Sequence, residues 1–325
     1  MLGDWSRLIY IQDKKTSKFW TPGCYPAKVK LDKYECRHGL GYTIIKSVCK
    51  GISVTERILV PRGNDPVEIL TIKIKNTGKK AQSLNVYFCS ELLLTGPTTL
   101  YGEILQYTNA DFDRKLNAIM AFNNSEARPH PKYNGFVAYD FKINTYDCSR
   151  RTFLGAYSSI SSPDAVKEGR CSNSLATGED MMAVVQSLVN LKPEQEKVMN
   201  ILFGVTDFPK ETRRLIKKYL SNKSINSEMQ KVIKKQNKIC NYLTVETPDK
   251  EINTRINIWI KRQILFGAEW VRWGRKGYRD ILQHAQGVLS LNTDLAKKDL
   301  IDAMHYQRKD GSCLRGWSPI DTYRY

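Results

Sequence analysis

The 325-residue sequence lacks the features that identify several large classes of protein. No apolar run approaches the roughly 20 residues needed to cross a bilayer. The start, from Met1 to Trp5, has no apolar segment of the kind found in secretory signals. There is no Gly-rich phosphate loop, Ser-His-Asp pattern or HExxH string. We therefore expect a soluble, cytoplasmic protein that makes no membrane contact and uses none of these chemistries.

Cysteines are few and widely spaced. The smallest gap in sequence between any two of the eight is 12 residues, between Cys24 and Cys36, so no CxxC pair exists for zinc or redox chemistry. Eight cysteines in 325 residues is also far below the density of a disulfide scaffold. We expect reduced and mostly buried thiols, with no metal site and no cofactor.

Positive charge is abundant, at a net +18, and unevenly distributed. Segment 210–238 holds ten Lys and Arg residues against Glu211 and Glu228. Nucleic-acid binding usually combines such a patch with stacking aromatic residues or a known reading motif. Here Tyr219 is the one aromatic residue. A solvated helical face is favoured, no nucleic-acid partner is expected, and nucleic-acid binding is the weaker alternative.

From Leu8 to about Thr206 the pattern predicts successive strands. In segment 70–75 three apolar residues alternate with Thr71, Lys73 and Lys75, which predicts one apolar and one wet face. Turn-forming residues separate the segments, so the pattern favours an antiparallel β-sandwich. The other clearest strand segments are 54–60, 83–88, 135–141, 181–188 and 197–205.

After Phe208-Pro209 the apolar residues recur at helical spacing. Thr247 is expected to cap a further helix, with Pro248 at its first position and Asp249 near its positive end. Another helix follows Asn292-Thr293. The predicted fold is α+β and multidomain: a β-sandwich over 1–207 whose N-terminal part is missing, a basic helical linker over 208–246, and a helical domain over 247–325.

Six short strings stand in the order found in one enzyme family. Together they resemble cellobiose phosphorylases and their relatives in glycoside hydrolase family 94, which are inverting glycoside phosphorylases formerly grouped with glycosyltransferases. The strings are Tyr10–Asp13, Phe19–Pro22, Tyr34–Thr43, Phe153–Tyr157, Gly169–Ser174 and Gly277–Asp280.

The resemblance implies both an architecture and a reaction. Residues 247–325 would be the first helices of an incomplete (α/α)6 catalytic barrel, in a family that is usually homodimeric. The implied reaction cleaves a β-linked glucosyl disaccharide or oligosaccharide. Inorganic phosphate, the co-substrate, attacks the anomeric carbon and gives an α-sugar 1-phosphate; no cofactor takes part.

The string from Trp273 to Gln283 places two arginines and a carboxylate on a glycine-containing turn that leads into a helix. The resemblance assigns donor-sugar binding to Asp280, with Arg275 as its arginine partner and with Arg279 and Gln283 beside them. A carboxylate accepts bonds from sugar hydroxyls, and an arginine fork donates to others. The alternative is that Arg279 and Asp280 only form an ion pair at the helix start.

The next residue, His284, stands where many relatives have Asp. It could act as a replacement acid, but the favoured interpretation is a residue of the pocket wall.

The sequence also departs from the family. The general acid of the family lies in a D-W-N-D-like string downstream of the turn, and no such string occurs here. We therefore expect a fragment without a general acid or phosphate site, inactive alone, whose apolar helical stripe lacks cover. Two alternatives stay open: a non-catalytic carbohydrate-binding protein, and the phosphorylase domain of a cyclic β-1,2-glucan synthase. The stripe comprises Ile252, Ile256, Trp259 and Ile260, with Phe266, Trp270 and Trp273 near it.

Overall fold

The computed structural model describes residues 7–92, 94, 107–124, 134–206, 209–269 and 276–317. Contacts divide the chain into two compact units, Met1–Val232 and Ile233–Tyr325. The division falls within one long helix, α5 (Asn222–Cys240). Each unit has hydrophobic clusters of its own.

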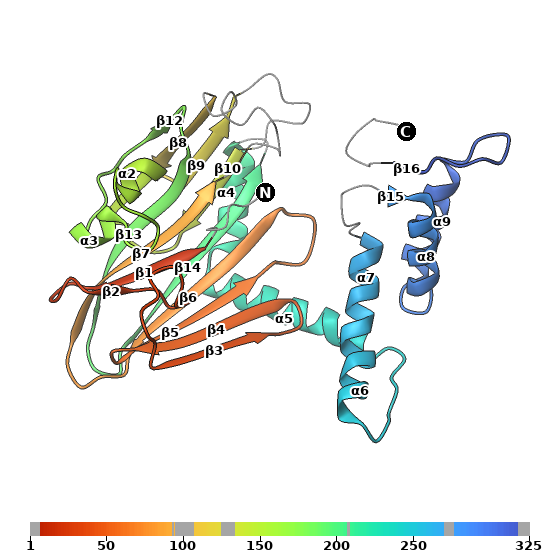
Figure 1. The fold of residues 1–325 in the computed structure, drawn as a ribbon, viewed down its shortest axis with the longest axis horizontal. Helices are drawn as coiled ribbons and strands as arrows, with labels where there is room; N and C mark the ends of the chain where they lie inside the picture. The colour runs from red at the N-terminus through yellow and green to blue at the C-terminus, as the bar shows by residue number, and fades with distance from the viewer. Residues whose placement is uncertain are drawn as a thin grey trace. The chain divides into compact units, whose positions relative to one another are not determined.

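The first unit is built on two β-sheets packed face to face (Figure 1). One sheet has five strands in the order β11-β13-β7-β1-β2, and the other has nine in the order β12-β8-β9-β10-β14-β6-β5-β4-β3. Neighbouring strands pair antiparallel throughout, which confirms the predicted sandwich. The strands are β1 (Leu8–Asp13), β2 (Phe19–Trp20), β3 (Lys33–His38), β4 (Tyr42–Cys49), β5 (Ile52–Leu59), β6 (Val67–Asn76), β7 (Gln82–Leu92), β8 (Thr108–Asp113), β9 (Ala118–Asn123), β10 (Asn134–Tyr139), β11 (Thr145–Ser149), β12 (Ala176–Thr177), β13 (Met181–Leu191) and β14 (Glu196–Thr206).

Strand β6 shows where the sequence pattern was correct and where it failed. Its residues 70, 72 and 74 are fully buried in the core between the sheets, as their alternation predicted. The opposite face is not wet along its whole length, because Ile69 is also fully buried and packs with Leu215 of helix α4 (Pro209–Tyr219). Only towards its end does this face meet solvent, where Lys73 pairs with Glu196.

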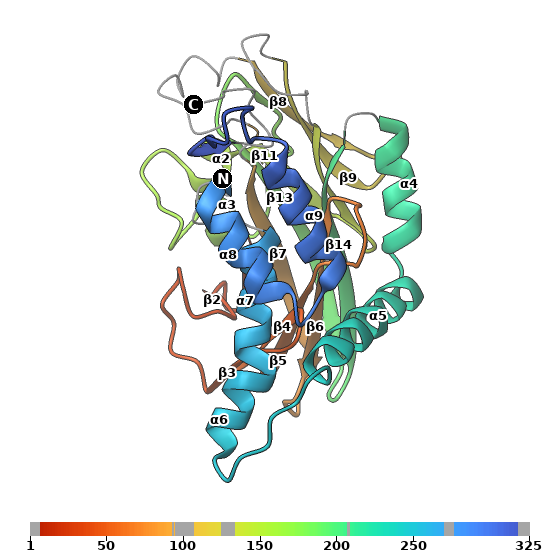
Figure 2. The same ribbon diagram turned by 90° about the vertical axis from the view of Figure 1, so that its right-hand side faces the viewer.

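Helices cover the outer faces of both sheets (Figure 2). Helices α2 (Arg150–Leu154) and α3 (Asp164–Glu168) pack on the five-stranded sheet, with Phe153 and Val166 fully buried against its strands. Helix α4 packs on the nine-stranded sheet. The first unit is therefore layered as helix, sheet, sheet and helix, with apolar clusters between successive layers.

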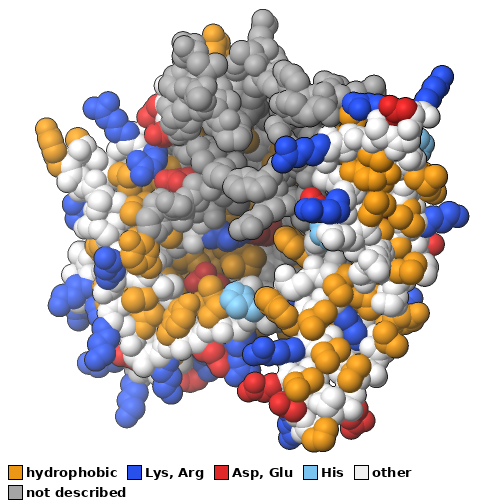
Figure 3. All heavy atoms as spheres, turned by 45° about the vertical axis from the view of Figure 1, so that its right-hand side comes forward, with side chains coloured by type: hydrophobic (Ala, Val, Ile, Leu, Met, Phe, Trp, Pro, Cys, Tyr) orange, Lys and Arg blue, Asp and Glu red, His pale blue; other side chains and the backbone are white. Residues whose placement is uncertain are grey.

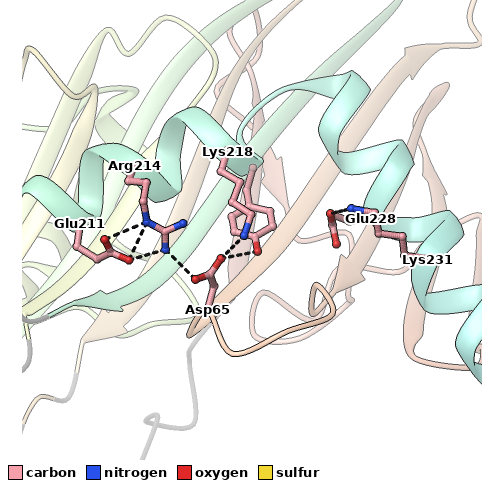
Figure 4. Close-up of polar contacts among 7 residues, drawn as sticks. Asp65, Glu211, Arg214, Lys218, Glu228 and Lys231 are labelled. Atoms are coloured by element: carbon pink, nitrogen blue, oxygen red, sulfur yellow. Dashed lines mark hydrogen bonds and ion pairs between the residues drawn. The ribbon is translucent and has the colours of Figure 1, made fainter.

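Helix α4 is held to the β5–β6 loop by one carboxylate, Asp65 (Figure 4). Its oxygens accept from Arg214 Nη2 at 2.8 Å, Lys218 Nζ at 2.6 Å and the Tyr219 hydroxyl at 2.7 Å. The hydrogen bond from Lys218, with further bonds from Tyr219 and Arg214, holds the pKa of Asp65 well below its usual range. Part of the basic segment 210–238 therefore fixes this helix in place.

The second unit is helical. Helices α8 (Tyr278–Val288) and α9 (Thr293–Met304) pack together through Val288 with Ala296 and through Ile281 with Ala303. None of the helices in the described ranges is long and apolar enough to cross a bilayer. The elements are α6 (Lys250–Thr254), the π-helical turn η1 (Arg255–Ile260), α7 (Lys261–Glu269), β15 (Lys276–Gly277), α8 (Tyr278–Val288), α9 (Thr293–Met304) and β16 (Gly316–Trp317).

Helix α6 does not begin where the sequence predicted. Its cap is Asp249, whose side chain accepts from the backbone N–H groups of Glu251 and Ile252. The predicted cap, Thr247, lies two residues earlier and instead donates to the Asn253 side chain at 2.8 Å. The prediction was wrong because Asp249 is itself a strong capping residue and reaches the helix N–H groups directly.

All eight cysteines are free thiols, and five of them are buried. This confirms the expectation of reduced, mostly buried cysteines.

Candidate functional site

The turn that carries the candidate residues is fixed by a strand from the end of the described chain. Strand β15 pairs with β16, placing Gly277 opposite Gly316, and the N–H of Tyr278 donates to the carbonyl of Arg315 at 3.1 Å. Gly277 is the N-cap of α8, with φ −78° and ψ 138°, and makes no side-chain cap. The start of the helix is therefore set by backbone pairing rather than by a capping side chain.

An aromatic cluster supports this turn. Trp317 is 3% exposed, stacks on Tyr306 at 4.3 Å between ring centroids, and meets Tyr278 edge-on at 6.3 Å. A hydrogen bond with Cys313 raises the pKa of Tyr278. Trp317 and Tyr306 are not predictable from the sequence, because no local spacing relates them to a turn so much earlier in the chain.

Asp280 is the third residue of α8, near the positive end of the helix dipole. Its carboxylate folds back over Gly277, so close that any side chain at position 277 would collide with Oδ2. Half of the Asp280 side chain stays exposed, at 52%. This position of the carboxylate therefore requires glycine at 277, and the turn presents a carboxylate to solvent.

Arg279 lies beside Asp280 but forms only a long, exposed ion pair with it. The Nη2 to Oδ1 distance is 3.7 Å, and the arginine side chain is 84% exposed. An exposed ion pair of this kind contributes roughly 0–1 kcal/mol to folding stability. The ion pair between Arg279 and Asp280 is therefore a weak contact. Gln283 is exposed one turn further along the same helix. Arg275 lies outside the described residues.

His284 packs against the neighbouring helix. Its ring lies over Gly267 of α7, with Nε2 3.6 Å from the position that a Cβ atom of Gly267 would take. Within the described ranges, no group of three or more His, Cys, Asp or Glu side chains could hold a metal ion. We interpret His284 as a wall residue between α7 and α8, since it approaches that glycine closely.

Large apolar side chains lie on the surface of the second unit (Figure 3). Trp259 is 60% exposed, Phe266 62% and Met304 65%. Ile252 and Ile260 of the predicted stripe are also exposed, while Trp270 and Trp273 lie outside the described residues. Large apolar side chains exposed in such number are typical of an interaction face.

Two family descriptions match the chain in succession. "Glycosyl hydrolase 94, supersandwich domain" matches residues 1–222, and "Glycosyl hydrolase 94 superfamily, catalytic domain" matches residues 236–323. The chain belongs to glycosyl hydrolase family 94. The four-layered first unit is thus its supersandwich domain, and α6 to β16 fall in its catalytic domain.

Several relatives of the chain are phosphorylases by name. Solabiose phosphorylase from Paenibacillus borealis is 37% identical over 320 residues, which are 98% of this chain and 41% of that protein. A 3-O-β-D-glucopyranosyl-β-D-glucuronide phosphorylase from the same organism is 28% identical over 324 residues, 97% of this chain and 41% of that protein. The chain therefore spans about two fifths of the length of the relatives that it matches.

A solved structure shares the fold. It belongs to a protein from the human microbiome assigned as a kojibiose phosphorylase, with a TM-score of 0.55 and 12% sequence identity. The match covers 92% of this chain and 38% of that chain. At this level of identity the likeness concerns architecture alone.

Proposed function

We propose that the chain is part of an inverting glycoside phosphorylase that acts on a β-linked glucosyl disaccharide or oligosaccharide. Membership of family 94 across both units and the phosphorylase activity in the relatives' names support this proposal. In the complete enzyme, phosphate would attack the anomeric carbon and release an α-sugar 1-phosphate with inversion. The proposed organisation is a sandwich over 1–207, a linker over 208–246 and the start of the barrel over 247–325.

The observation that carries the proposal is the solvent-facing carboxylate of Asp280 on a turn built around Gly277. A carboxylate can accept bonds from two neighbouring sugar hydroxyls, and the Arg279 guanidinium can donate to others. Gln283 offers both a donor and an acceptor one turn away. We propose that these side chains, with Arg275, hold the donor ring for displacement.

The chain alone is proposed to bind the donor sugar without turning it over. In the family the general acid belongs to a D-W-N-D-like string, which this sequence lacks. Without an acid to protonate the glycosidic oxygen, the leaving group is not activated and phosphate has no path to product.

The proposal is tested by measuring glucose and cellobiose binding to the full chain and to Asp280→Asn. We expect weak binding that falls about tenfold or more in the variant, because a hydrogen bond to a charged group contributes roughly 1.5–3 kcal/mol. Asp294→Asn is the matched control, since Asp294 is also an exposed acid in the first turn of a helix. Its binding should equal that of the unchanged chain.

Two results would contradict the proposal. Sugar binding that survives in Asp280→Asn would favour a carbohydrate-binding protein with its site elsewhere. Formation of sugar 1-phosphate by the chain alone, from any β-glucosyl disaccharide and phosphate, would show that the acid and anion site are present after all.

A further inference from the structure

Strand β3 lies at the edge of the nine-stranded sheet and carries an unusual set of side chains. The register places Cys36 opposite Ile45 of β4, and Ile45 opposite Glu56 of β5. Residues opposite one another in antiparallel strands point to the same face. Cys36 and, two residues along, His38 therefore share the inner face of the sandwich with the buried Glu56, yet both are exposed. The apolar core ends before it reaches β3.

Cys36, His38 and Thr43 of β4 form a chain of contacts. Cys36 Sγ lies 3.6 Å from His38 Nε2, and His38 Nδ1 lies 3.0 Å from Thr43 Oγ1. When Nδ1 carries the proton and donates to Thr43, Nε2 is left as an acceptor facing the thiol. A nucleophile beside a base that is oriented by a third group is the arrangement that activates nucleophilic side chains.

The other cysteines lack this arrangement. Burial raises the pKa of Cys148 to about 12, which keeps its thiol protonated and unreactive. Cys24 and Cys313 each donate to a backbone carbonyl oxygen, at 3.8 Å in both cases, and such a partner holds the proton on sulfur. Among the hydrogen bonds that the structure describes for the eight cysteines, only the bond of Cys36 has an imidazole as its partner.

We propose that Cys36 is a reactive thiol that exchanges with low-molecular-weight disulfides such as glutathione disulfide. His38 Nε2 takes the proton from Sγ, and the sulfur attacks one sulfur of the glutathione disulfide. The Cys36–glutathione bond forms as the glutathione S–S bond breaks. The departing thiolate takes the proton back from His38, so the products are one mixed disulfide and one molecule of glutathione.

The test is to incubate the native chain with glutathione disulfide, stop the reaction with acid, digest, and follow each cysteine by mass spectrometry. Cys24 provides an internal reference, because it is also exposed and its described hydrogen bond is to the carbonyl oxygen of Val29 rather than to an imidazole. We expect Cys36 to react faster than Cys24 on the order of tenfold, which is below the range of a fully formed general base because the pair is exposed.

Variants separate the roles of the neighbours. His38→Gln should bring the Cys36 rate down to that of Cys24, and Thr43→Val should lower it part of the way. His305→Gln, which alters an exposed histidine of the second unit, should leave it unchanged. The Cys24 rate in each variant reports any general loosening of the fold. Equal rates at Cys36 and Cys24 in the native chain, or an unchanged Cys36 rate in His38→Gln, would overturn the proposal.

Discussion

The carboxylate of Asp280 lies over the backbone of Gly277, within the space that any side chain at position 277 would need. The backbone of Gly277 has a φ of −78°, which other residues adopt without strain. The glycine is therefore needed for the close approach of the acid and not for the conformation of the turn.

Gly277→Ala follows directly from that contact. The new methyl group should push the Asp280 side chain out of its position and weaken sugar binding severalfold. The melting temperature should change little, because the backbone conformation suits alanine and the acid is half exposed. Titration with cellobiose and a thermal melt measure the two effects, and unchanged binding would show that this placement of the carboxylate is irrelevant to the sugar.

Glu56 should make the first unit less stable as pH rises. Burial raises the pKa of Glu56 to about 7, and among the described residues no hydrogen-bond donor or cation reaches its carboxylate. The unfolded value is about 4.3, so the folded chain binds the proton more tightly, and stability is lost between about pH 4 and pH 8. The free energy of unfolding of Glu56→Gln should equal that of the unchanged chain at pH 4 and should be about 3 kcal/mol higher at pH 8.

Urea unfolding at several pH values measures this difference, with Glu35→Gln, whose side chain is 44% exposed, as the control. A stability gap between Glu56→Gln and the unchanged chain that does not vary with pH would show that Glu56 does not titrate in this range.

Asp65 should behave in the opposite way. Its pKa is lowered by Lys218, Tyr219 and Arg214, so its contribution is complete above the unfolded value of about 3.9 and is lost as pH falls below about 4. Asp65→Asn should cost about 1 kcal/mol at pH 7, a modest figure because the basic partners are half exposed to solvent. Glu211→Gln, which leaves Asp65 intact, should cost less. Chemical denaturation at pH 7 and pH 3 measures both, and a penalty as large at pH 3 as at pH 7 would contradict the assignment.

Asp147 should be the most costly acid to remove. It is 1% exposed, and its Oδ1 accepts from the backbone N–H and hydroxyl of both Ser172 and Ser174, at 2.8–3.1 Å. Asp147→Ala would remove the one buried acceptor that four part-buried hydrogen bonds from Ser172 and Ser174 share, a loss of about 3 kcal/mol by urea unfolding. Asp113→Ala is the comparison, because Asp113 accepts two backbone N–H bonds at the surface of a turn. Similar losses in both variants would mean that burial is unimportant here.

Local sequence patterns predicted the helices and strands better than they predicted which other elements pack against them. The alternation in β6 correctly placed residues 70, 72 and 74 in the core, since strand periodicity acts over neighbouring residues. It could not show that α4 covers Ile69 on the other face, because that contact joins segments far apart in sequence. The prediction of the N-cap of α6 was wrong for a local reason. Thr247 and Asp249 are both capping residues, and the sequence alone did not decide between them.

The candidate site was predictable in part. The resemblance located the turn around Asp280, but neither it nor the residue pattern indicated that Trp317 and Tyr306 support the turn from the end of the described chain. The contact between Cys36 and His38 was not predicted, because only the strand shows that both lie on one face beside Thr43.

The most direct test of the account is an amide NMR titration of the isotope-labelled chain with glucose. Donor binding at the turn predicts that shift changes concentrate at residues 277–284 and leave the strands of the first unit unaffected. Changes confined to residues 7–206, with none at 277–284, would contradict the account and place the sugar on the sandwich.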